Sequence, residues 1–504
     1  MRKLSVGLLL WSAWASACAA SHVAPEGRGL DGDAGSGLMA DAGREVDAGG
    51  PVVPAIDAGG SPLDAGGDAG PDVGMYACAR DEHVQGGRCV ACDGGTHNHA
   101  GDPVPGPDTA CDEDVCAVTL DLESCEVFEE AYLKASDTSA GSHFSRSVAL
   151  SQDGSTLAVG ASRRNAVYVF VREDGGTWAQ QALLETGERA GALRGAKFGW
   201  AVSLSRDGST LAVGAHGDDS NARGVNGDSS NDDALWSGAA YVFTRAGEIW
   251  TQHAYIKASN AEGVHLPPSR WDELRGDEGD QFGISLALSG DGQTLAVGAL
   301  YEDSRSTGIN GDPYDDPYRN HDSGAVYVFV RELDSWSQEA YVKAGTSRAD
   351  NFGLAVALSH DGSRLAASAR VIGPQSGVVH VFERAADRTW AEEAALHASN
   401  DDMGDRFGTS LSMGGDGATL AVGAPGEEGA GTGVDADPND NSASDSGAVY
   451  LFVRNPGAAW SQEAYLKASN NEMWGREGFG LAMSLSDDGS TLAVGAPFEG
   501  GSGT

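Results

Sequence analysis

The feature that most constrains the fold of this chain is a repeat that runs through its C-terminal three quarters. In one copy Phe282-Gly283 is followed by Asp291-Gly292, then by Leu295–Ala299 and by the aromatic run Val326–Phe329. The Asp-Gly pair recurs in steps of 54, 84, 70, 55 and 72 residues, with its aspartates at Asp153, Asp207, Asp291, Asp361, Asp416 and Asp488. A unit of about 54 residues with insertions in its loops indicates a repeat architecture, and such architectures mostly present binding surfaces.

Each unit predicts four short strands. In the third copy they are residues 282–289, 293–299, 324–331 and 336–343, which alternate apolar and polar residues between turn residues. Asp291-Gly292 predicts a hairpin because Gly accepts positive φ without steric cost, and the small Gly298-Ala299 predicts a close approach of two backbones. A Trp in every fourth strand predicts packing between units, at Trp178, Trp250, Trp336, Trp390 and Trp460.

Four-stranded units in series, without a helical apolar stripe, predict an all-β fold, a β-propeller of four-stranded blades. The copies resemble the FG-GAP repeat of the integrin α-chain β-propeller over residues 127–504. The Phe-Gly half begins at Phe198, Phe282, Phe352, Phe407 and Phe479, and the Gly-Ala-Pro half is complete at 423–425 and 495–497. A WD-repeat propeller is the alternative, and the Phe-Gly pair argues against it.

Closure of the ring is the open question in this fold. The chain supplies five complete units and a partial sixth, whereas the resemblance implies seven blades, so we expect an incomplete ring or a truncated chain. Residues 129–136 match a fourth strand and are expected to complete the last blade. The resemblance also implies calcium between the first and second strands, but here that connection is a tight turn without the carboxylates, so the calcium positions of the family cannot be transferred.

The N-terminal quarter predicts an exported, tethered protein. Residues 1–18 combine Arg2-Lys3, an apolar segment too short to span a bilayer, and a lipobox-like end at Cys18, the predicted lipid attachment site. Cleavage after Ala17 by an ordinary signal peptidase is the alternative. Residues 19–75 repeat Asp-Ala-Gly and predict a disordered linker, because so few large apolar residues cannot form a core. We expect an outer-membrane or cell-surface location, or alternatively a secreted or periplasmic one.

Residues 76–126 form a Cys-rich module. An even number of cysteines in a short exported segment predicts three disulfides, with fifteen possible pairings, among Cys78, Cys89, Cys92, Cys111, Cys116 and Cys125. A zinc site is the alternative, because Cys89 and Cys92 have zinc-ligand spacing and His97 and His99 follow.

The charge of the chain excludes some partners. The 74 Asp and Glu against 33 Lys and Arg give a formal net charge of −41. Nucleic-acid binding needs the opposite sign, so no nucleic acid is expected, and the membrane is expected to be contacted only through the N-terminal lipid. A negative chain of this kind attracts cations.

The acidic residues concentrate in three long loops between second and third strands. The loops share the pattern Asn/Asp-x-Asp-x-x-Asn/Asp-Asp/Asn, and calcium takes six to eight such oxygens. They therefore predict calcium ligands, with a solvated acidic loop as the alternative, at Asn226, Asp228, Asn231, Asp232, Asn310, Asp312, Asp315, Asp316, Asp322, Asp435, Asp437, Asp440, Asn441 and Asp445. In an antiparallel blade these loops emerge on the same face as the connections to the next blade, so all long loops are expected on one face.

The sequence contains none of the common catalytic motifs that were sought. The sequence has no His-Glu-x-x-His, no Gly-x-Ser-x-Gly and no phosphate-binding loop. We therefore predict a non-enzymatic binding or adhesion protein whose propeller face engages a protein or glycan on another surface. The alternatives are a propeller hydrolase or lyase and a purely structural envelope component.

Overall fold

The computed structural model describes most of the repeat region and a few short strands before it. The described residues are 5–7, 76–77, 82–85, 88–91, 103–104, 131–137, 141–174, 176–186, 195–263, 279–314, 322–345, 349–371, 377–400, 402–455, 457, 459–470 and 477–498. The chain divides into two compact units, residues 16–126 and the remainder. The smaller unit contains two short antiparallel pairs, β2 (Tyr76–Ala77) with β5 (Pro103–Val104) and β3 (Glu82–Gln85) with β4 (Arg88–Ala91).

The larger unit is a series of antiparallel sheets, one for each repeat, and the prediction of an all-β propeller is confirmed. Blades 1 and 2 are β6 (Phe144–Leu150), β7 (Thr156–Ala161), β8 (Ala166–Arg172) and β9 (Trp178–Glu185), then β10 (Ala201–Leu204), β11 (Thr210–Ala215), β12 (Ala239–Ala246) and β13 (Ile249–Ile256). Blade 3 is β14 (Phe282–Leu288), β15 (Thr294–Ala299), β16 (Ala325–Glu332) and β17 (Ser335–Val342). The strands of blade 3 lie within about two residues of those predicted.

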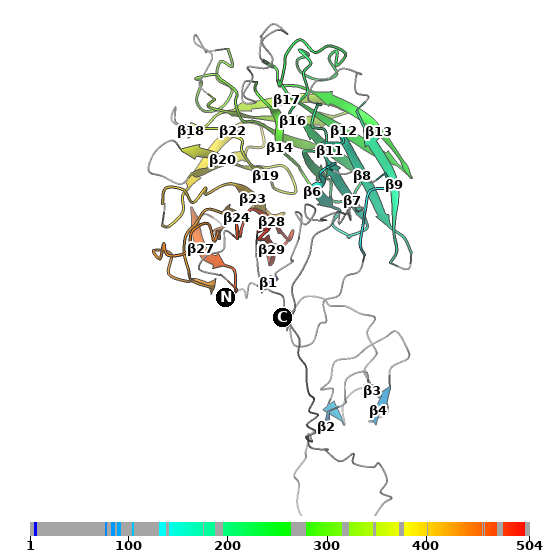
Figure 1. The fold of residues 1–504 in the computed structure, drawn as a ribbon, viewed down its shortest axis with the longest axis vertical. Coiled ribbons are helices and arrows are strands. Elements are labelled where there is room, and N and C mark those ends of the chain that lie inside the picture. The colour runs from blue at the N-terminus through cyan, green and yellow to red at the C-terminus, as the bar shows by residue number, and fades with distance from the viewer. Residues whose placement is uncertain are drawn as a thin grey trace, which may run out of the picture. The chain divides into compact units, whose positions relative to one another are not determined.

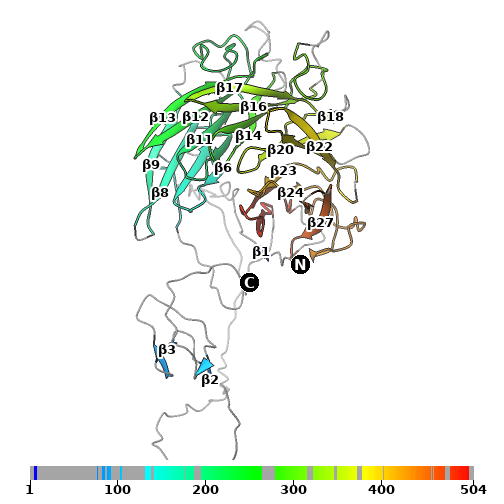
Figure 2. The same ribbon diagram turned by 180° about the vertical axis from the view of Figure 1, so that it is seen from behind.

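The later blades carry small additions to this plan. Blade 4 is β19 (Val356–Leu358), β20 (Arg364–Val371), β21 (Val378–Arg384) and β22 (Trp390–Leu396), with β18 (Ala349–Asp350) on β20. Blade 5 is β23 (Ser410–Met413), β24 (Thr419–Ala424), β26 (Ala448–Arg454) and β27 (Trp460–Lys467), with β25 (Gly433–Val434) on the outer edge. Blade 6 pairs β28 (Ala482–Leu485) with β29 (Thr491–Gly495). In both views the blades follow one another from cyan β6 to red β29 (Figures 1 and 2).

The Phe-Gly and Gly-Ala halves of the repeat meet between neighbouring blades. A Cβ added to Gly298 of blade 3 would lie 2.2 Å from the carbonyl oxygen of Gly353 in blade 4, and one added to Gly353 would lie 2.6 Å from the carbonyl oxygen of Ala325. The pairs Gly160–Gly199, Gly214–Gly283 and Gly423–Gly480 repeat this contact. In these four pairs the predicted close approach of backbones is therefore an interblade contact that leaves no room for a Cβ on either glycine.

Side chains pack both within and between the blades. Phe282 packs edge-on against Tyr327 of its own blade, with ring centroids 5.4 Å apart. The indole N–H of Trp250 donates to Gln181 of the preceding blade at 2.9 Å, and that of Trp390 donates to Glu339 at 2.9 Å. The predicted packing of the recurrent Trp between blades is confirmed at these positions.

The Asp-Gly hairpins of all six blades are joined around the propeller axis. In each hairpin the aspartate carboxylate accepts from the backbone two residues later, as in Gln293 N to Asp291 Oδ1 at 2.9 Å. Backbone bonds then link successive hairpins, from Gln152 to Arg206, Arg206 to Gly290, Asp291 to His360, His360 to Gly415 and Gly415 to Asp487. Arg206 also pairs with Asp487 at 2.9 Å, so the second and sixth blades meet at the axis.

The strand predicted at residues 129–136 is wrong for the part that is described, because residues 131–135 are not in a strand. Leu133 and Ala135 instead pack against blade 1, and Asp137 accepts hydrogen bonds from Tyr168 and Arg164. The described part of blade 6 offers this segment no third strand to pair with.

The first and last blades of the series each show a feature that the sequence did not predict. Residues 1–18 were expected to lie outside the fold, but β1 (Ser5–Gly7) pairs in parallel with β29. An exposed edge strand presents unpaired backbone groups that an apolar segment can bind, which accounts for this pairing. In blade 1, Leu150 is 56% exposed whereas the equivalent Leu288 is 7% exposed, so the outer face of β6 is less covered than its counterparts.

Candidate functional site: the loop face

The long loops emerge on one face of the propeller, as predicted. The hairpins between first and second strands are joined into one ring at the axis, so the opposite ends of all the blades point to the other face. We call this other face the loop face; among the described residues it carries 216–238, 300–314, 322–324 and 425–447, together with the described parts of the connections between blades. Direct contacts support this placement, because Tyr314 Oη accepts from Arg223 of the neighbouring loop at 3.4 Å and donates to Ser259 O at 3.3 Å.

Each long loop is fastened to the outer strand of its own blade by the first residue of the acidic pattern. Asn226 N donates to Tyr255 O at 2.7 Å, and Asn226 Oδ1 accepts from Tyr255 N at 2.9 Å. Asn226 has φ of +56°, a conformation that Asn tolerates better than most residues. The same two bonds recur between Asn310 and Tyr341 and between Asp435 and Tyr465.

The next residues of the pattern shape the loop tips. The carboxylates of Asp228, Asp312 and Asp437 each accept from the backbone N–H two residues later, at 2.8, 3.0 and 3.0 Å. Across the loops, Asn231 Oδ1 accepts from Asn221 N at 2.9 Å and Asp440 Oδ2 accepts from Ala430 N at 3.3 Å. These side chains therefore bond to the loop backbone.

The remaining predicted ligands are more scattered. Asn441 Nδ2 donates to Asp402 at 3.0 Å, Asp232 is exposed, and Asp322 and Asp445 take positive φ. Asp315 and Asp316 lie outside the described residues. Within the described part of the chain no three His, Cys, Asp or Glu side chains converge in a metal-holding group. Calcium at these residues stays a prediction.

Under each long loop lies a buried ion pair that sequence reasoning missed. Lys257 pairs with Asp218 at 3.1 Å, Lys343 with Glu302 at 2.5 Å and Lys467 with Glu427 at 2.6 Å, and all six side chains are at most 9% exposed. Each lysine also donates to a serine at the far end of its loop: Ser237, Ser323 and Ser446, at 2.6, 2.7 and 2.7 Å. The lysine therefore ties both ends of the loop to the fourth strand. We call this arrangement the lysine staple.

The staple occurs in the described blades that carry a long loop. In blade 1, with its short connection, the charges are exchanged, and Arg164 pairs with Glu185 at 2.7 Å with both side chains more than a third exposed. In blade 4, His397 takes the lysine position and is exposed. The sequence does contain a signal for this ion pair. In blades 2, 3 and 5 an acidic residue stands three positions after Gly-Ala, and a lysine stands at the end of the fourth strand.

Burial sets the protonation behaviour of the staples. Burial lowers the pKa of Lys257, while Asp218 and Asp280 oppose that shift. Asp218 also accepts from the hydroxyls of Tyr255 and Tyr241, at 2.8 and 3.1 Å, and burial raises the pKa of both tyrosines. A buried charge is tolerated only with partners of this kind.

An aromatic cluster lies beside the first staple. His216 is 5% exposed, its ring centroid lies 4.5 Å from that of Trp200 and 6.1 Å from that of Trp236, and the Arg146 guanidinium lies 3.9 Å from the Trp200 centroid. Burial, with Lys197 and Arg146 nearby, lowers the pKa of His216 to about 3.

This shift predicts a pH-dependent stability. Between about pH 6.5 and 3, His216 is protonated in the unfolded chain but neutral in the folded protein. The contribution of neutral His216 to stability is therefore fully present above about pH 6.5 and is lost as the pH falls towards 3. We expect a loss of about 2 kcal/mol by pH 5. His216→Leu, which installs the blade 3 residue, should remove this component from urea unfolding measured at pH 7.5 and 5. Equal pH dependence in both proteins would contradict the assignment.

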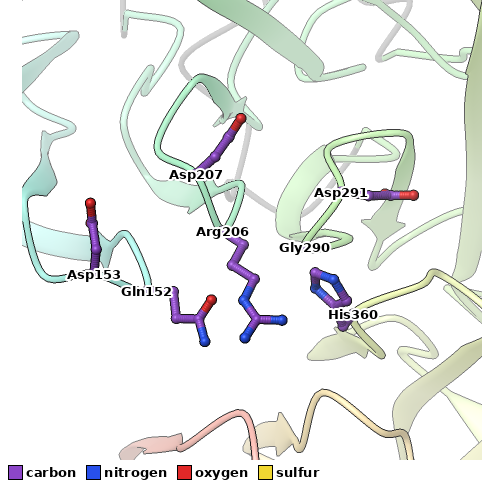
Figure 3. A pocket seen from close by; sticks show the side chains of 7 residues that line it. All are labelled: Gln152, Asp153, Arg206, Asp207, Gly290, Asp291 and His360. Atoms are coloured by element: carbon purple, nitrogen blue, oxygen red, sulfur yellow. The ribbon is translucent and has the colours of Figure 1, made fainter.

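A second site lies on the opposite face, at the axis. A pocket of about 440 Å³ is lined by Gln152, Asp153, Arg206, Asp207, Gly290, Asp291 and His360 (Figure 3). Gln152 and Arg206 extend to the same side, whereas Asp153 and Asp207 point away from them in Figure 3. The carboxylates are occupied within their own turns, as in the bond from Ser205 Oγ to Asp207 Oδ1 at 2.6 Å. The pocket therefore presents mainly Arg206, His360 and amide groups.

Comparisons with known proteins agree with this architecture. The family profile described as FG-GAP repeat matches residues 127–170, 178–243, 276–329 and 390–452. The chain carries FG-GAP repeats. The close contact between Gly298 and Gly353, and its counterparts between other blades, explains why the repeat has glycine in both its Phe-Gly and its Gly-Ala halves. No curated protein matches the chain in sequence.

Several solved structures are similar to this FG-GAP chain in outline. A Lactobacillus plantarum protein is 12% identical with a TM-score of 0.39, covering 69% of this chain and 73% of its own. A putative 6-phosphogluconolactonase from Bacteroides fragilis is 15% identical with a TM-score of 0.36, covering 68% and 72%. The β-propeller domain of Cps50 (Swd1) from Myceliophthora thermophila is 12% identical with a TM-score of 0.33, covering 71% and 91%.

The N-terminal predictions fall largely outside the described residues. Cys18 and every cysteine of the Cys-rich module except Cys89 lie there, and Cys89 is described only as part of strand β4. The disulfides, the zinc alternative and the lipid therefore stay predictions. In the described part of the chain no helix is long and apolar enough to cross a membrane.

Proposed function

We propose that this FG-GAP propeller is a non-enzymatic binding or adhesion protein of the cell envelope. Its loop face engages a protein or glycan on another surface. In this proposal an N-terminal lipid on Cys18 anchors the chain, and residues 19–75 act as the linker between the anchor and the folded part.

The observation that carries the proposal is the lysine staple under each long loop. Lys257, Lys343 and Lys467 are buried beneath loops of blades 2, 3 and 5, so these long insertions are held on rigid blades. Loops mounted on a rigid scaffold are the usual location of binding residues, and preorganised loops lose less conformational entropy on binding.

The exposed bridge between two of these loops is the expected centre of contact. The Arg223 guanidinium lies 5.8 Å from the Tyr314 ring centroid, and Tyr314 is 56% exposed. Tyr and Arg are enriched among residues that dominate binding energy, because both combine apolar area with hydrogen bonding. Such a pair suits a glycan or a protein surface.

The test is binding of the full chain to a glycan array and to purified envelope proteins. Tyr314→Ala and Arg223→Ala should each weaken capture at least about tenfold, because truncation of a residue that dominates binding costs about 2 kcal/mol or more. His360→Ala, on the opposite face, is the control and should bind as the parent does. Loss of binding in the control with normal binding by both loop variants would overturn the assignment to the loop face.

The alternative is a propeller enzyme, and the observation that favours it is the pocket at the axis. It brings Arg206 of blade 2 and His360 of blade 4 to one pocket, beside Gly290 and Asp291 of blade 3. A panel of glycosidic and ester substrates tests this alternative. Turnover that disappears in His360→Ala but persists in Tyr314→Ala would replace the binding proposal.

A further inference from the structure

Two clusters of carboxylates lie beneath the loop face, in equivalent positions of blades 3 and 5. None of their members belongs to the acidic pattern of the loop tips. The blade 3 cluster is Glu262, Asp280, Glu302 and Asp303, and the blade 5 cluster is Asp402, Asp405, Glu427 and Glu428. In each cluster two acids come from the connection that enters the blade and two from its long loop.

The scaffold around the two clusters is also repeated. In blade 3, Asn260 Nδ2 donates to Glu302 Oε1 at 2.9 Å and to Pro313 O at 3.2 Å. In blade 5, Asn400 donates to Glu427 Oε1 and Pro438 O at 3.3 and 2.7 Å. The same asparagine in each case accepts from the blade tyrosine, Tyr327 or Tyr450. Two insertions of different length thus build one arrangement of oxygen atoms.

The negative charge in these clusters exceeds the positive charge supplied by the staples. In each cluster the lysine of the staple pairs with one of the four acids, Lys343 with Glu302 and Lys467 with Glu427. In blade 3, Asp280 is 4% exposed and accepts from Glu262 N at 2.7 Å; burial raises its pKa, and the charges of Glu302, Asp303 and Glu262 raise it further. Carboxylates gathered in this way repel one another unless a cation or protons intervene.

The sharpest observation is one oxygen in the blade 5 cluster. Asp405 is 2% exposed, and its Oδ2 is buried without a hydrogen-bond partner. Burial raises the pKa of the Asp405 carboxyl, and the nearby negative charges of Glu427, Asp402 and Glu428 raise it further. A buried carboxylate oxygen without a hydrogen-bond partner is unfavourable, so it points to a ligand.

Blade 3 shows the space that such a ligand would occupy. A cavity of about 140 Å³ is lined by the four carboxylates with Asn260, Ser304, Pro313 and Tyr314. This volume holds a metal ion with several water molecules. Its walls offer carboxylate, hydroxyl, amide and carbonyl oxygens, which are the ligands of a hard cation.

We propose that the blade 3 cluster and the blade 5 cluster each bind one partly hydrated calcium ion. No three acidic side chains of the described residues converge as direct ligands, so the ion takes one or two carboxylates and fills its other positions with backbone oxygens and water. Calcium suits such a site better than magnesium, because it accepts six to eight oxygens in irregular geometry whereas magnesium requires a near-ideal octahedron. The ion would tie the connection between blades to the long loop beside it.

This site is distinct from the loop tips predicted from the sequence, and the two can be separated by titration. The full chain, freed of metal with a chelator, is titrated with calcium chloride alone in a calorimeter. We expect two ions per chain, one in Asp405→Asn, one in Asp280→Asn and none in the double variant. Asp437→Asn, at the exposed tip of the blade 5 loop, is the matched control and should keep two.

The other possible results of this titration would contradict the proposal. Absence of calcium binding would mean that protons neutralise the clusters, and unchanged binding in both cluster variants, or loss of a site in Asp437→Asn, would move the ions to the loop tips. Because Asp280 and Asp405 are buried, the half-buried Glu262→Gln and Glu428→Gln provide a second set, in which each should weaken one site at least about tenfold. Ligand capture on the loop face is not part of this measurement, so the result does not depend on the proposed function.

Discussion

Replacing Lys343 by Met is expected to lower the free energy of unfolding by about 3–5 kcal/mol. Lys343 Nζ lies 2.5 Å from Glu302 Oε2 and 2.7 Å from Ser323 Oγ, and both charged side chains are at most 3% exposed. Met fills a similar volume but leaves Glu302 as an uncompensated buried charge. Urea unfolding of the full chain in chelator measures this loss without any contribution from calcium.

A second substitution in the same ion pair identifies the cause. The double variant Lys343→Met/Glu302→Gln should recover at least half of the loss, because no buried charge remains. A deficit that is unchanged in the double variant would mean that Lys343 acts by packing alone.

Blade 2 provides the matched control for the lysine staple. Lys257→Met should be milder, because Asp218 keeps hydrogen bonds from Tyr255 Oη at 2.8 Å, Tyr241 Oη at 3.1 Å and Ser220 N at 3.1 Å. Glu302 has fewer other donors, chiefly Asn260 Nδ2 at 2.9 Å. An equal loss in both variants would contradict the assignment of the effect to unpaired carboxylate charge.

Adding a single methyl group at Gly298 is expected to destabilise the propeller by about 3 kcal/mol. The new Cβ would lie 2.2 Å from the carbonyl oxygen of Gly353 and 2.3 Å from Ser285 Oγ, so blades 3 and 4 would have to separate. Overpacking against backbone is costly because backbone, unlike a flexible side chain, cannot rotate away. Thermal and urea unfolding of Gly298→Ala against the parent measure the effect.

The chain contains its own control for this substitution. At the equivalent position of blade 4 the residue is Ser368, and a Cβ added to the facing Gly408 would meet the Ser368 side chain at 2.8 Å. That interface already accommodates a side chain on one partner, so Ser368→Ala should change stability by less than about 1 kcal/mol. A Gly298→Ala protein as stable as Ser368→Ala would show that the spacing between blades is set by something other than the glycine contact.

Sequence reasoning was strongest where structure is local. The strands of blade 3 depend on the alternation of apolar and polar residues, and the Asp291-Gly292 hairpin depends on a positive φ at the glycine. Both are determined by residues that are adjacent in the sequence. It failed for residues 131–135, which match a fourth strand but are not in one, because a strand needs a partner that the described part of blade 6 does not supply. Pattern matching reports what a segment can form, whereas pairing depends on what lies beside it.

The acidic loops show the same limit in the candidate site. Asn226, Asn310 and Asp435 match a cation-binding pattern, yet in the structure their side chains accept hydrogen bonds from the outer strand. Asp405, Glu427 and the staple lysines could not be recognised as a site from the sequence. The acids are separated by insertions of different length, and Lys467 has the pattern of a polar residue at the end of a strand. Their proximity arises only when the strands of one blade pair and its loop folds over them.

The sequence by itself therefore determined the repeat, the β-propeller and the face on which its loops emerge, since strand periodicity, turn residues and the antiparallel order are local properties. Only the tertiary structure decided which charges are buried. Lys343 and Glu302 are 41 residues apart, and the environment that makes their pairing important exists only beneath the loop that covers them. Burial, and with it the strength of every electrostatic interaction on the loop face, depends on how the blades and loops pack together.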